Sequence, residues 1–243
     1  MIKVVNVCAK YDADPKLSNH ILNKISFNVA QGEIIGVLGR NGVGKSTLLR
    51  VMAGILKPLS GIVEYKGEDI TVFDSRSIIQ RGVSFIAQGR ECFLDLTVEE
   101  NIKVALLPFK LSKKDIDKRT KIALNYFKQL EENKKRLVYN LSGGIRQMLV
   151  IAMAFVQYPS CVLLDEPSIG LSESSLGQFI NLIEQFKNND KSMVIVEQKA
   201  QIIFDICDYI HFMDHGNIIL SGRPSEIKEN ELFHKLYLGV NNN

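Results

Sequence analysis

The sequence contains no apolar run long enough to cross a bilayer. Its longest apolar run, Met148 to Val156, is far shorter than the roughly 20 residues that a membrane-spanning helix needs. The first residues, MIKVVNV, alternate as in a strand and lack the apolar core and small-residue cleavage site of a signal peptide. We therefore expect a cytoplasmic chain, for which any role at a membrane requires a partner.

The sequence also has few cysteines and a low net charge. The 243 residues include four scattered cysteines, Cys8, Cys92, Cys161 and Cys207, without the CxxC spacing of a zinc site. This distribution favours reduced, buried thiols over a disulfide framework. The formal net charge of +3 provides no broad basic surface, so nucleic acid is not an expected partner.

What the sequence does contain is a series of short apolar segments separated by helical patterns. They have the length and composition of strands buried on both faces of a largely parallel sheet, and they span 34–38, 83–87, 162–164 and 193–196. The turn residues His215, Gly216 and Asn217 predict a hairpin between strands at 209–213 and 218–220. Together these segments indicate an α/β fold.

A helix-rich stretch interrupts the α/β pattern. Residues 89–158 include an amphipathic segment at 116–130, preceded by a Ser112-x-x-Asp115 capping box. We interpret 89–158 as a helical insert in a core formed by residues 1–88 and 159–243. The chain shows no linker, repeat or low-complexity tract, so we expect residues 1–243 to form a single domain.

The segment Gly39-Arg-Asn-Gly-Val-Gly-Lys-Ser-Thr47 follows one apolar segment and precedes a helical pattern. This is the context of a phosphate-binding P-loop, in which glycines let backbone N–H groups turn toward an anion at a helix N-terminus. Lys45 would then contact the β- and γ-phosphates of a nucleotide, and the Ser46 hydroxyl would bind Mg²⁺.

Two adjacent acids, Asp165 and Glu166, end the apolar segment that begins at Cys161. Side chains of neighbouring strand residues point to opposite sides. One carboxylate can therefore reach the Mg²⁺ shell while the other faces an attacking water. We assign Asp165 to the metal and Glu166 to the water.

A second glycine-rich helix start lies at Leu141-Ser-Gly-Gly144. Ser142 is a suitable N-cap, but each glycine within the first turn costs about 1 kcal/mol relative to alanine. In return, Gly143 and Gly144 leave backbone N–H groups open to an anion, with the Ser142 hydroxyl as a further donor. Because the chain has a single lysine-bearing phosphate loop, we expect this second site to serve a nucleotide held by another subunit.

These motifs together carry a family resemblance. Gly39–Thr47, Gln88, Leu141–Gly144 with Gln147, and Leu163–Pro167 occur in the order and approximate spacing of the ATP-binding cassette (ABC) ATPases. The chain resembles that family along essentially its whole length. The resemblance implies a RecA-like P-loop NTPase core with a mainly parallel sheet, an N-terminal antiparallel β portion and an inserted α-helical subdomain.

The resemblance also implies ATP and Mg²⁺ as cofactors, and a head-to-tail dimer in which each ATP lies between the P-loop of one chain and the LSGG helix of the other. The residues implied to contact ATP are Tyr11, which would stack on adenine, and Gly39, Asn41, Gly42, Gly44, Lys45, Ser46, Thr47 and Gln88, with Ser142, Gly143 and Gly144 acting on the partner's ATP. The residues implied in catalysis are Lys45, Gln88, Gln198 and the general base Glu166. Those implied to hold Mg²⁺ are Ser46, Gln88 and Asp165.

The chain departs from the family pattern at several positions. Gln198 stands where members usually have a histidine that contacts the γ-phosphate; it can donate a hydrogen bond but cannot titrate near neutral pH. Ser172 replaces an aspartate that reaches across the dimer, Met153 a common arginine and Ile145 a frequent glutamine. We hypothesise that the chain forms a heterodimer with a histidine-bearing ATPase, and a homodimer is the alternative.

Three segments resemble one branch of the family: Val196-Glu-Gln198, the stretch from Gln88 to Asn101, and the ending Tyr237-Leu-Gly239. That branch contains ATPases of branched-chain amino acid and urea importers, so the expected cargo is a small polar solute. The implied partners are integral membrane subunits, a second ATPase subunit and a solute-binding protein. Through them the chain would lie on the inner face of the cell membrane.

Other functions stay open. ATPases of lipid or polysaccharide exporters share the Tyr-Leu-Gly ending, although they generally keep the histidine that Gln198 replaces. A non-transport ABC protein acting on ribosomes or DNA would usually contain two cassettes or long coiled coils, and the sequence has neither. A P-loop kinase, in which the LSGG helix is merely structural, is the last alternative.

Overall fold

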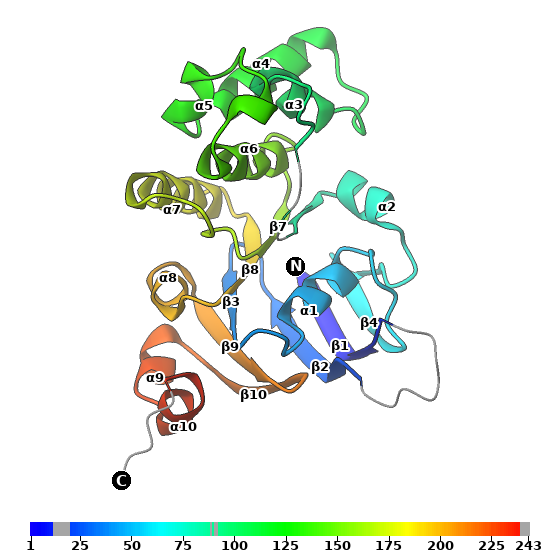
Figure 1. The fold of residues 1–243 in the computed structure, drawn as a ribbon. Coiled ribbons are helices and arrows are strands. Elements are labelled where there is room, and N and C mark those ends of the chain that lie inside the picture. The colour runs from blue at the N-terminus through cyan, green and yellow to red at the C-terminus, as the bar shows by residue number, and fades with distance from the viewer. Residues whose placement is uncertain (12–19, 88, 90–91, 239–243) are drawn as a thin grey trace.

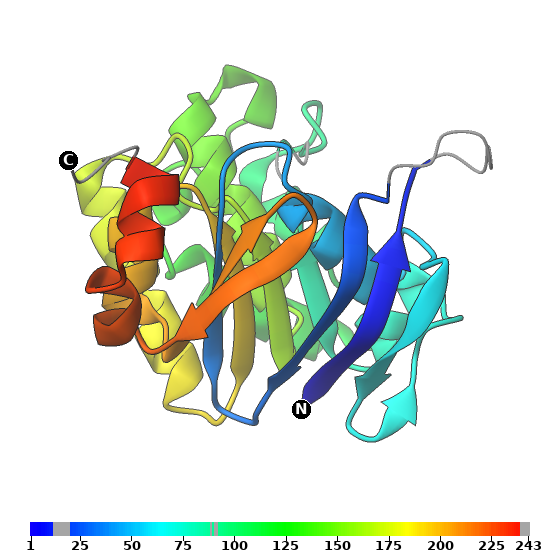
Figure 2. The ribbon, with the colours of Figure 1, turned by 90° about the horizontal axis from the view of Figure 1, so that it is seen from below.

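The computed structural model describes residues 1–11, 20–87, 89 and 92–238. Two sheets form its centre, with helices between and around them and a cluster of helices at one end (Figure 1). Seen from below, the small N-terminal sheet and the C-terminal helices lie on opposite sides of the molecule (Figure 2).

The smaller sheet is antiparallel, with the strand order β2-β1-β4-β5. Its strands are β1 (Ile2–Ala9), β2 (Leu22–Val29), β4 (Ser60–Tyr65) and β5 (Glu68–Asp69). Ile2 pairs with Val29 and Val4 with Phe27, and all four side chains are buried. The expected antiparallel portion at the N-terminus is therefore confirmed.

The larger sheet has six strands in the order β10-β9-β3-β8-β7-β6. They are β3 (Ile34–Leu38), β6 (Val83–Ile86), β7 (Cys161–Asp165), β8 (Ser192–Glu197), β9 (Tyr209–Asp214) and β10 (Asn217–Gly222). Every pairing is parallel except the β9–β10 hairpin. The mainly parallel sheet and its hairpin are as predicted, and the carboxyl ends of β3, β7 and β8 meet at one edge.

Helices cover both faces of the larger sheet, which explains why its central strands are apolar throughout. The helix α1 (Lys45–Met52) packs between the two sheets, where Leu48, Leu49 and Met52 share an apolar cluster with both. The opposite face is covered by α6 (Gly143–Phe155), α7 (Glu173–Lys187) and α8 (Ala200–Ile206). At the C-terminus follow α9 (Pro224–Lys228), α10 (Glu231–Phe233) and the π-helical turn η2 (His234–Leu238).

After β6 the chain forms a group of helices at one end of the molecule (Figure 1). Apart from α6, they are α3 (Val98–Val104), α4 (Lys113–Leu124), α5 (Lys128–Glu132) and the 3-10 turn η1 (Val138–Asn140), while α2 (Ser75–Gln80) precedes β6. The prediction of one amphipathic helix over 116–130 is wrong, because α4 ends at Leu124 and α5 begins at Lys128. Between them Phe127 is extended and fully buried, so the chain bends where this ring enters the core.

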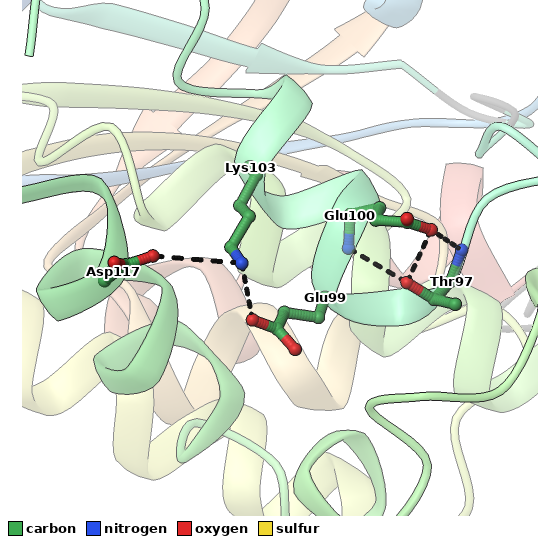
Figure 3. A network of polar contacts seen from close by, with 5 residues as sticks. All are labelled: Thr97, Glu99, Glu100, Lys103 and Asp117. Atoms are coloured by element: carbon green, nitrogen blue, oxygen red, sulfur yellow. Dashed lines mark hydrogen bonds and ion pairs between the residues drawn. The ribbon is translucent and has the colours of Figure 1, made fainter. Parts of the chain in front are cut away.

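The start of α3 is fixed by a capping box (Figure 3). The Thr97 Oγ1 accepts from the Glu100 backbone N–H at 3.2 Å, and the Glu100 carboxylate accepts from the Thr97 backbone N–H at 2.8 Å. Lys103 joins α3 to α4, since its Nζ lies 2.6 Å from Glu99 and 3.8 Å from Asp117. The capping box fixes where α3 begins, and the exposed ion pair between Lys103 and Asp117 links α3 to α4.

The described residues form no helix that is long and apolar enough to span a membrane. All four cysteines lie within the described part of the chain, are buried and form no disulfide, as expected. Burial raises the pKa of the Cys161 thiol to about 12, so this thiol is inert near neutral pH.

Candidate active site

The phosphate loop runs from the end of β3 into α1, and two of its glycines lie where a side chain would collide with backbone. A Cβ at Gly39 would lie 2.5 Å from the carbonyl oxygen of Met213, and one at Gly44 would lie 2.8 Å from that of Ile21. Both glycines also have positive φ angles, 156° and 107°. The loop conformation therefore requires glycine, and it ends with Gly44 as the N-cap of α1.

Lys45 is buried inside this loop. Its Nζ donates to the carbonyl oxygens of Gly39 at 2.8 Å and Arg40 at 2.9 Å. Burial lowers the pKa of Lys45, and the nearby carboxylates of Glu166, Asp165 and Glu197 act in the opposite direction. The loop and the strand ends thus hold one ammonium group beside three acids, where an anion can replace the carbonyl partners.

Ser46 and Asp165 meet across the carboxyl edge of the sheet. The Ser46 hydroxyl donates to Asp165 Oδ1 at 2.9 Å. A hydroxyl and a carboxylate are oxygen ligands of the kind that Mg²⁺ accepts together with phosphate oxygens and water, so these residues fit the ion. Within the described ranges no three His, Cys, Asp or Glu side chains form a metal cluster. Gln88, the third expected ligand, lies outside the described residues.

Glu166 has a strained backbone and a partner of its own. Its φ of 50° lies in the left-handed region, which costs a residue with a side chain roughly 1–2 kcal/mol. The Gln198 amide Nε2 donates to Glu166 Oε1 at 2.7 Å. The two neighbouring acids therefore face different groups: Asp165 faces Ser46, and Glu166 faces Gln198. Such strain is typical of functional positions.

Tyr11 stands at the mouth of the site with its side chain about half exposed. Its hydroxyl lies 3.1 Å from Thr47 Oγ1 and accepts from Arg50 Nη1 at 2.7 Å. The Arg50 guanidinium also lies 5.7 Å from the centre of the Tyr11 ring. An exposed ring held in this way can stack on a planar base.

A pocket of about 330 Å³ joins these groups, and its lining residues are Tyr11, Ile21, Asn41, Gly42, Gly44, Lys45, Ser46, Thr47, Glu166 and Gln198. Gly39 and Asp165 adjoin it through their hydrogen bonds to Lys45 and Ser46. The structure thus brings most of the expected site residues into one concave surface.

The LSGG segment lies elsewhere, since Ser142, Gly143 and Gly144 are not among the described residues that line this pocket. Ser142 is the N-cap of α6, and its hydroxyl accepts from the Ile145 N–H at 3.4 Å. The two glycines differ in their surroundings. A Cβ at Gly143 would meet open space, whereas one at Gly144 would lie 2.7 Å from the Gly170 carbonyl oxygen.

A further contact ties α6 to the segment after Glu166. The Gln147 amide donates to the Pro167 carbonyl oxygen at 3.1 Å. Together with the close approach of Gly144 to Gly170, this bond joins the LSGG helix to the loop that follows strand β7.

Glu197 and Arg50 belong to the site but were given no role from the sequence. Glu197 ends β8, and its carboxylate accepts from the Ser168 N–H at 2.9 Å and the Gln198 N–H at 3.3 Å. Desolvation raises the pKa of this buried acid. Like Asp165, Glu197 ends an apolar strand, and this position was visible in the sequence. The two backbone N–H groups that bond to Glu197 were not.

Comparisons with known proteins agree with this geometry. The family model described as "ABC transporter" matches residues 22–169. The chain is 33% identical to the high-affinity branched-chain amino acid transport ATP-binding protein BraG of Pseudomonas aeruginosa, over 90% of this chain and 93% of that protein. It is 29% identical to the lipopolysaccharide export system ATP-binding protein LptB of Haemophilus influenzae, over 91% of this chain and 92% of that protein.

The fold has a close counterpart among solved structures. A nucleotide-free ATP-binding cassette from an ABC transporter superimposes with a TM-score of 0.85, covering 99% of both chains at 23% identity. The family match, the relatives and the phosphate pocket lead to one conclusion: the chain belongs to the ABC transporter family, as an ATP-binding subunit that hydrolyses ATP.

Proposed function

We propose that this ATPase drives the import of a small polar solute, resembling a branched-chain amino acid or urea. The observation that carries the proposal is Gln198, whose amide contacts Glu166, because the segment Val196-Glu-Gln198 resembles that importer branch. The 33% identity to BraG, which is named for branched-chain amino acid transport, supports the same cargo class.

In the proposed reaction, Lys45 binds the β- and γ-phosphates and Glu166 is the general base. Glu166 takes a proton from water as the water oxygen bonds to the γ-phosphorus. The bond from that phosphorus to the bridging oxygen breaks, which yields ADP and phosphate. Gln198 orients the Glu166 carboxylate by its 2.7 Å hydrogen bond. When bound, Mg²⁺ would neutralise phosphate charge, held by Ser46, Asp165 and Gln88.

The proposed working unit is a head-to-tail dimer. Ser142 and Gly143 are exposed at the start of α6 and lie away from the chain's own phosphate pocket, which supports a role on a partner's ATP. Binding of two ATP molecules would then close the dimer, and hydrolysis would reopen it.

A groove beside α2 is the proposed docking surface for the membrane subunits. It has a volume of about 420 Å³ and a mainly apolar lining formed by Ala53, Ile55, Ser75, Ile78, Ile79, Val83, Phe85, Ala87 and Gly89. Farther along the chain, the buried side chain of Asn101 in α3 makes hydrogen bonds to the loop that precedes this helix. Its side chain accepts from the Phe93 N–H at 2.8 Å and donates to the carbonyl oxygens of Phe93 and Thr97 at 2.9 Å each. Docking there would place the chain on the cytoplasmic face of the membrane.

Purification of the tagged chain from detergent-solubilised membranes of its host tests the assembly. Mass spectrometry should identify two multi-span membrane proteins, a second ATPase with histidine at the place of Gln198, and a solute-binding protein. An unrelated tagged cytoplasmic protein is the control. Recovery of ribosomal proteins without membrane proteins would contradict transport.

Uptake assays test the cargo. A host strain carrying Glu166→Gln should lose uptake of labelled leucine or urea, whereas Glu173→Gln, an exposed acid in the first turn of α7, should retain it. The 29% identity to LptB makes lipid or polysaccharide export the second candidate. That candidate predicts normal uptake in the Glu166→Gln strain and accumulation of unexported lipid or polysaccharide.

A further inference from the structure

The C-terminal turn η2 reaches back to the strand end that carries Gln198. The Tyr237 hydroxyl donates to the Gln198 carbonyl oxygen and accepts from the Ala200 backbone N–H at 3.0 Å. One side chain therefore satisfies two backbone groups at the junction between β8 and α8. This junction is the segment from which the Gln198 side chain enters the active site.

An aromatic cluster determines where the Tyr237 hydroxyl lies. The Tyr237 ring stacks on Phe233 with centroids 5.0 Å apart and planes at 13°. Both rings also meet Phe212 of β9 edge-on, with centroid distances of 6.3 Å for Tyr237 and 5.6 Å for Phe233. Phe233 is buried, so the C-terminal segment is anchored on the sheet independently of the hydroxyl.

The backbone of Gln198 is thus held at both of its polar groups. Its N–H donates to Glu197 at 3.3 Å, and its carbonyl accepts from Tyr237. With the backbone fixed, the side-chain amide reaches Glu166 Oε1 at 2.7 Å. A backbone free to rotate would spread the amide over many positions, and catalysis depends on placement within a fraction of an ångström.

We propose that Tyr237 is a positioning residue for ATP hydrolysis: its hydroxyl fixes the Gln198 backbone and so orients the Gln198 amide on the general base. This inference rests on the proposed role of Gln198 in the site. It makes the C-terminal segment, which contributes no lining residue to the described phosphate pocket, part of the catalytic arrangement.

Tyr237→Phe tests this role, because it removes the hydroxyl and keeps the ring that packs on Phe233. In the full chain, purified with the subunits it retains, kcat for ATP should fall roughly three- to tenfold, the effect of losing one hydrogen bond in the transition state. The KM for ATP should stay within about twofold, because Tyr237 touches no pocket residue other than Gln198. Tyr209→Phe, in the same sheet strand as Phe212, is the matched control and should leave kcat unchanged.

A double mutant separates positioning from general stability. Because Tyr237 acts through the Gln198 side chain, Tyr237→Phe should have no further effect on kcat in the Gln198→Ala background. Two results would overturn the positioning role of Tyr237 alone. In the first, the losses of kcat caused by the two substitutions multiply in the double mutant. In the second, Tyr237→Phe has the wild-type kcat although Gln198→Ala is slow. A Gln198→Ala enzyme with wild-type kcat would overturn both this inference and the role proposed for Gln198.

Discussion

Glu166 combines a left-handed backbone, a buried carboxylate and a hydrogen bond from Gln198. Glu166→Gln keeps the shape of the side chain and removes its ability to accept a proton. We expect kcat to fall roughly 10²- to 10⁴-fold, as for loss of a general base, with ATP affinity unchanged. Steady-state ATPase assays and calorimetric titration with ATP measure the two quantities.

Glu173→Gln provides the control for the loss of one acid, since Glu173 is exposed on α7. Residual activity above about one tenth of wild type in Glu166→Gln would show that another group accepts the proton. A large loss of ATP affinity would instead assign Glu166 to binding.

His211 is a buried imidazole away from the phosphate pocket, and its titration bears on stability. It packs against Phe27 and Tyr209, with its Nδ1 2.7 Å from the Ser221 hydroxyl. Desolvation lowers its pKa from 6.5 to about 4. Since the folded pKa lies below the unfolded value, the neutral imidazole contributes stability that is complete above pH 6.5 and is lost as pH falls toward 4.

The free energy of unfolding should therefore fall on acidification, with a contribution from His211 of about 2 kcal/mol between pH 7 and pH 5. His211→Phe keeps a ring between Phe27 and Tyr209 and removes the titration. Between pH 7 and pH 5 this variant should therefore lose about 2 kcal/mol less unfolding free energy than wild type. Urea denaturation at both pH values measures the difference. Equal losses in wild type and His211→Phe would contradict a neutral buried imidazole.

At the scale of elements, the first turn of α6 offers two adjacent glycines with different surroundings. Gly143→Ala places a methyl group in open space, so the unfolding free energy should stay the same or rise by up to about 1 kcal/mol. Gly144→Ala places a methyl group 2.7 Å from the Gly170 carbonyl oxygen, so it should lower the unfolding free energy by about 1–3 kcal/mol. Denaturant melts of the two variants, measured side by side, test the contrast.

The two variants serve as controls for each other, because both replace glycine by alanine in the same helical turn. If Gly143→Ala were the less stable one, the contact between α6 and the loop after β7 would not explain the glycine at 144. ATPase measurements on Gly143→Ala add a second readout, since its exposed N-terminal position is the one proposed to face a partner's ATP.

Elements were predictable to different degrees. The strands at 34–38, 83–86 and 192–197 follow from short apolar runs, because burial on both faces leaves no polar alternation. The break between α4 and α5 was not predictable, because the apolar spacing continues through it. Burial of Phe127 against distant parts of the core decides that the helix stops there.

For the whole molecule, the exposed start of α6 predicts ATP-dependent dimerisation. Glu166→Gln with ATP and Mg²⁺, alone or mixed with a histidine-bearing second ATPase, should elute as a dimer in size-exclusion chromatography with light scattering, and ADP should leave monomers. Adding Ser142→Arg should abolish the dimer, because a bulky side chain at the exposed N-cap blocks the partner face, while ATP binding persists.

Failure of Glu166→Gln to dimerise alone but success with a histidine-bearing second ATPase would indicate the heterodimer. Failure with both would favour a P-loop kinase in which the LSGG helix is structural. A homodimer that hydrolyses ATP at the full rate of the assembled transporter would exclude the need for a partner histidine.

The phosphate loop, the paired acids and the LSGG helix start can all be recognised in the amino-acid sequence. Their chemistry depends on residues close together in the chain, so spacing alone specifies it: glycines before Lys45 and Ser46, a strand ending at Asp165 and Glu166, and a serine cap before two glycines. The parallel sheet then explains why the phosphate loop and the paired acids meet at one edge, whereas the LSGG helix start lies elsewhere.

Contacts between groups far apart in the chain depend instead on how the folded chain packs. This packing places Gln198 on Glu166, Gly170 against Gly144, and the Tyr237 hydroxyl on the backbone of Gln198. Each of these contacts joins residues more than 20 positions apart, and no local pattern encodes such a distance. They arise because strands and helices pack into one body, which brings the ends of β7, β8 and η2 together.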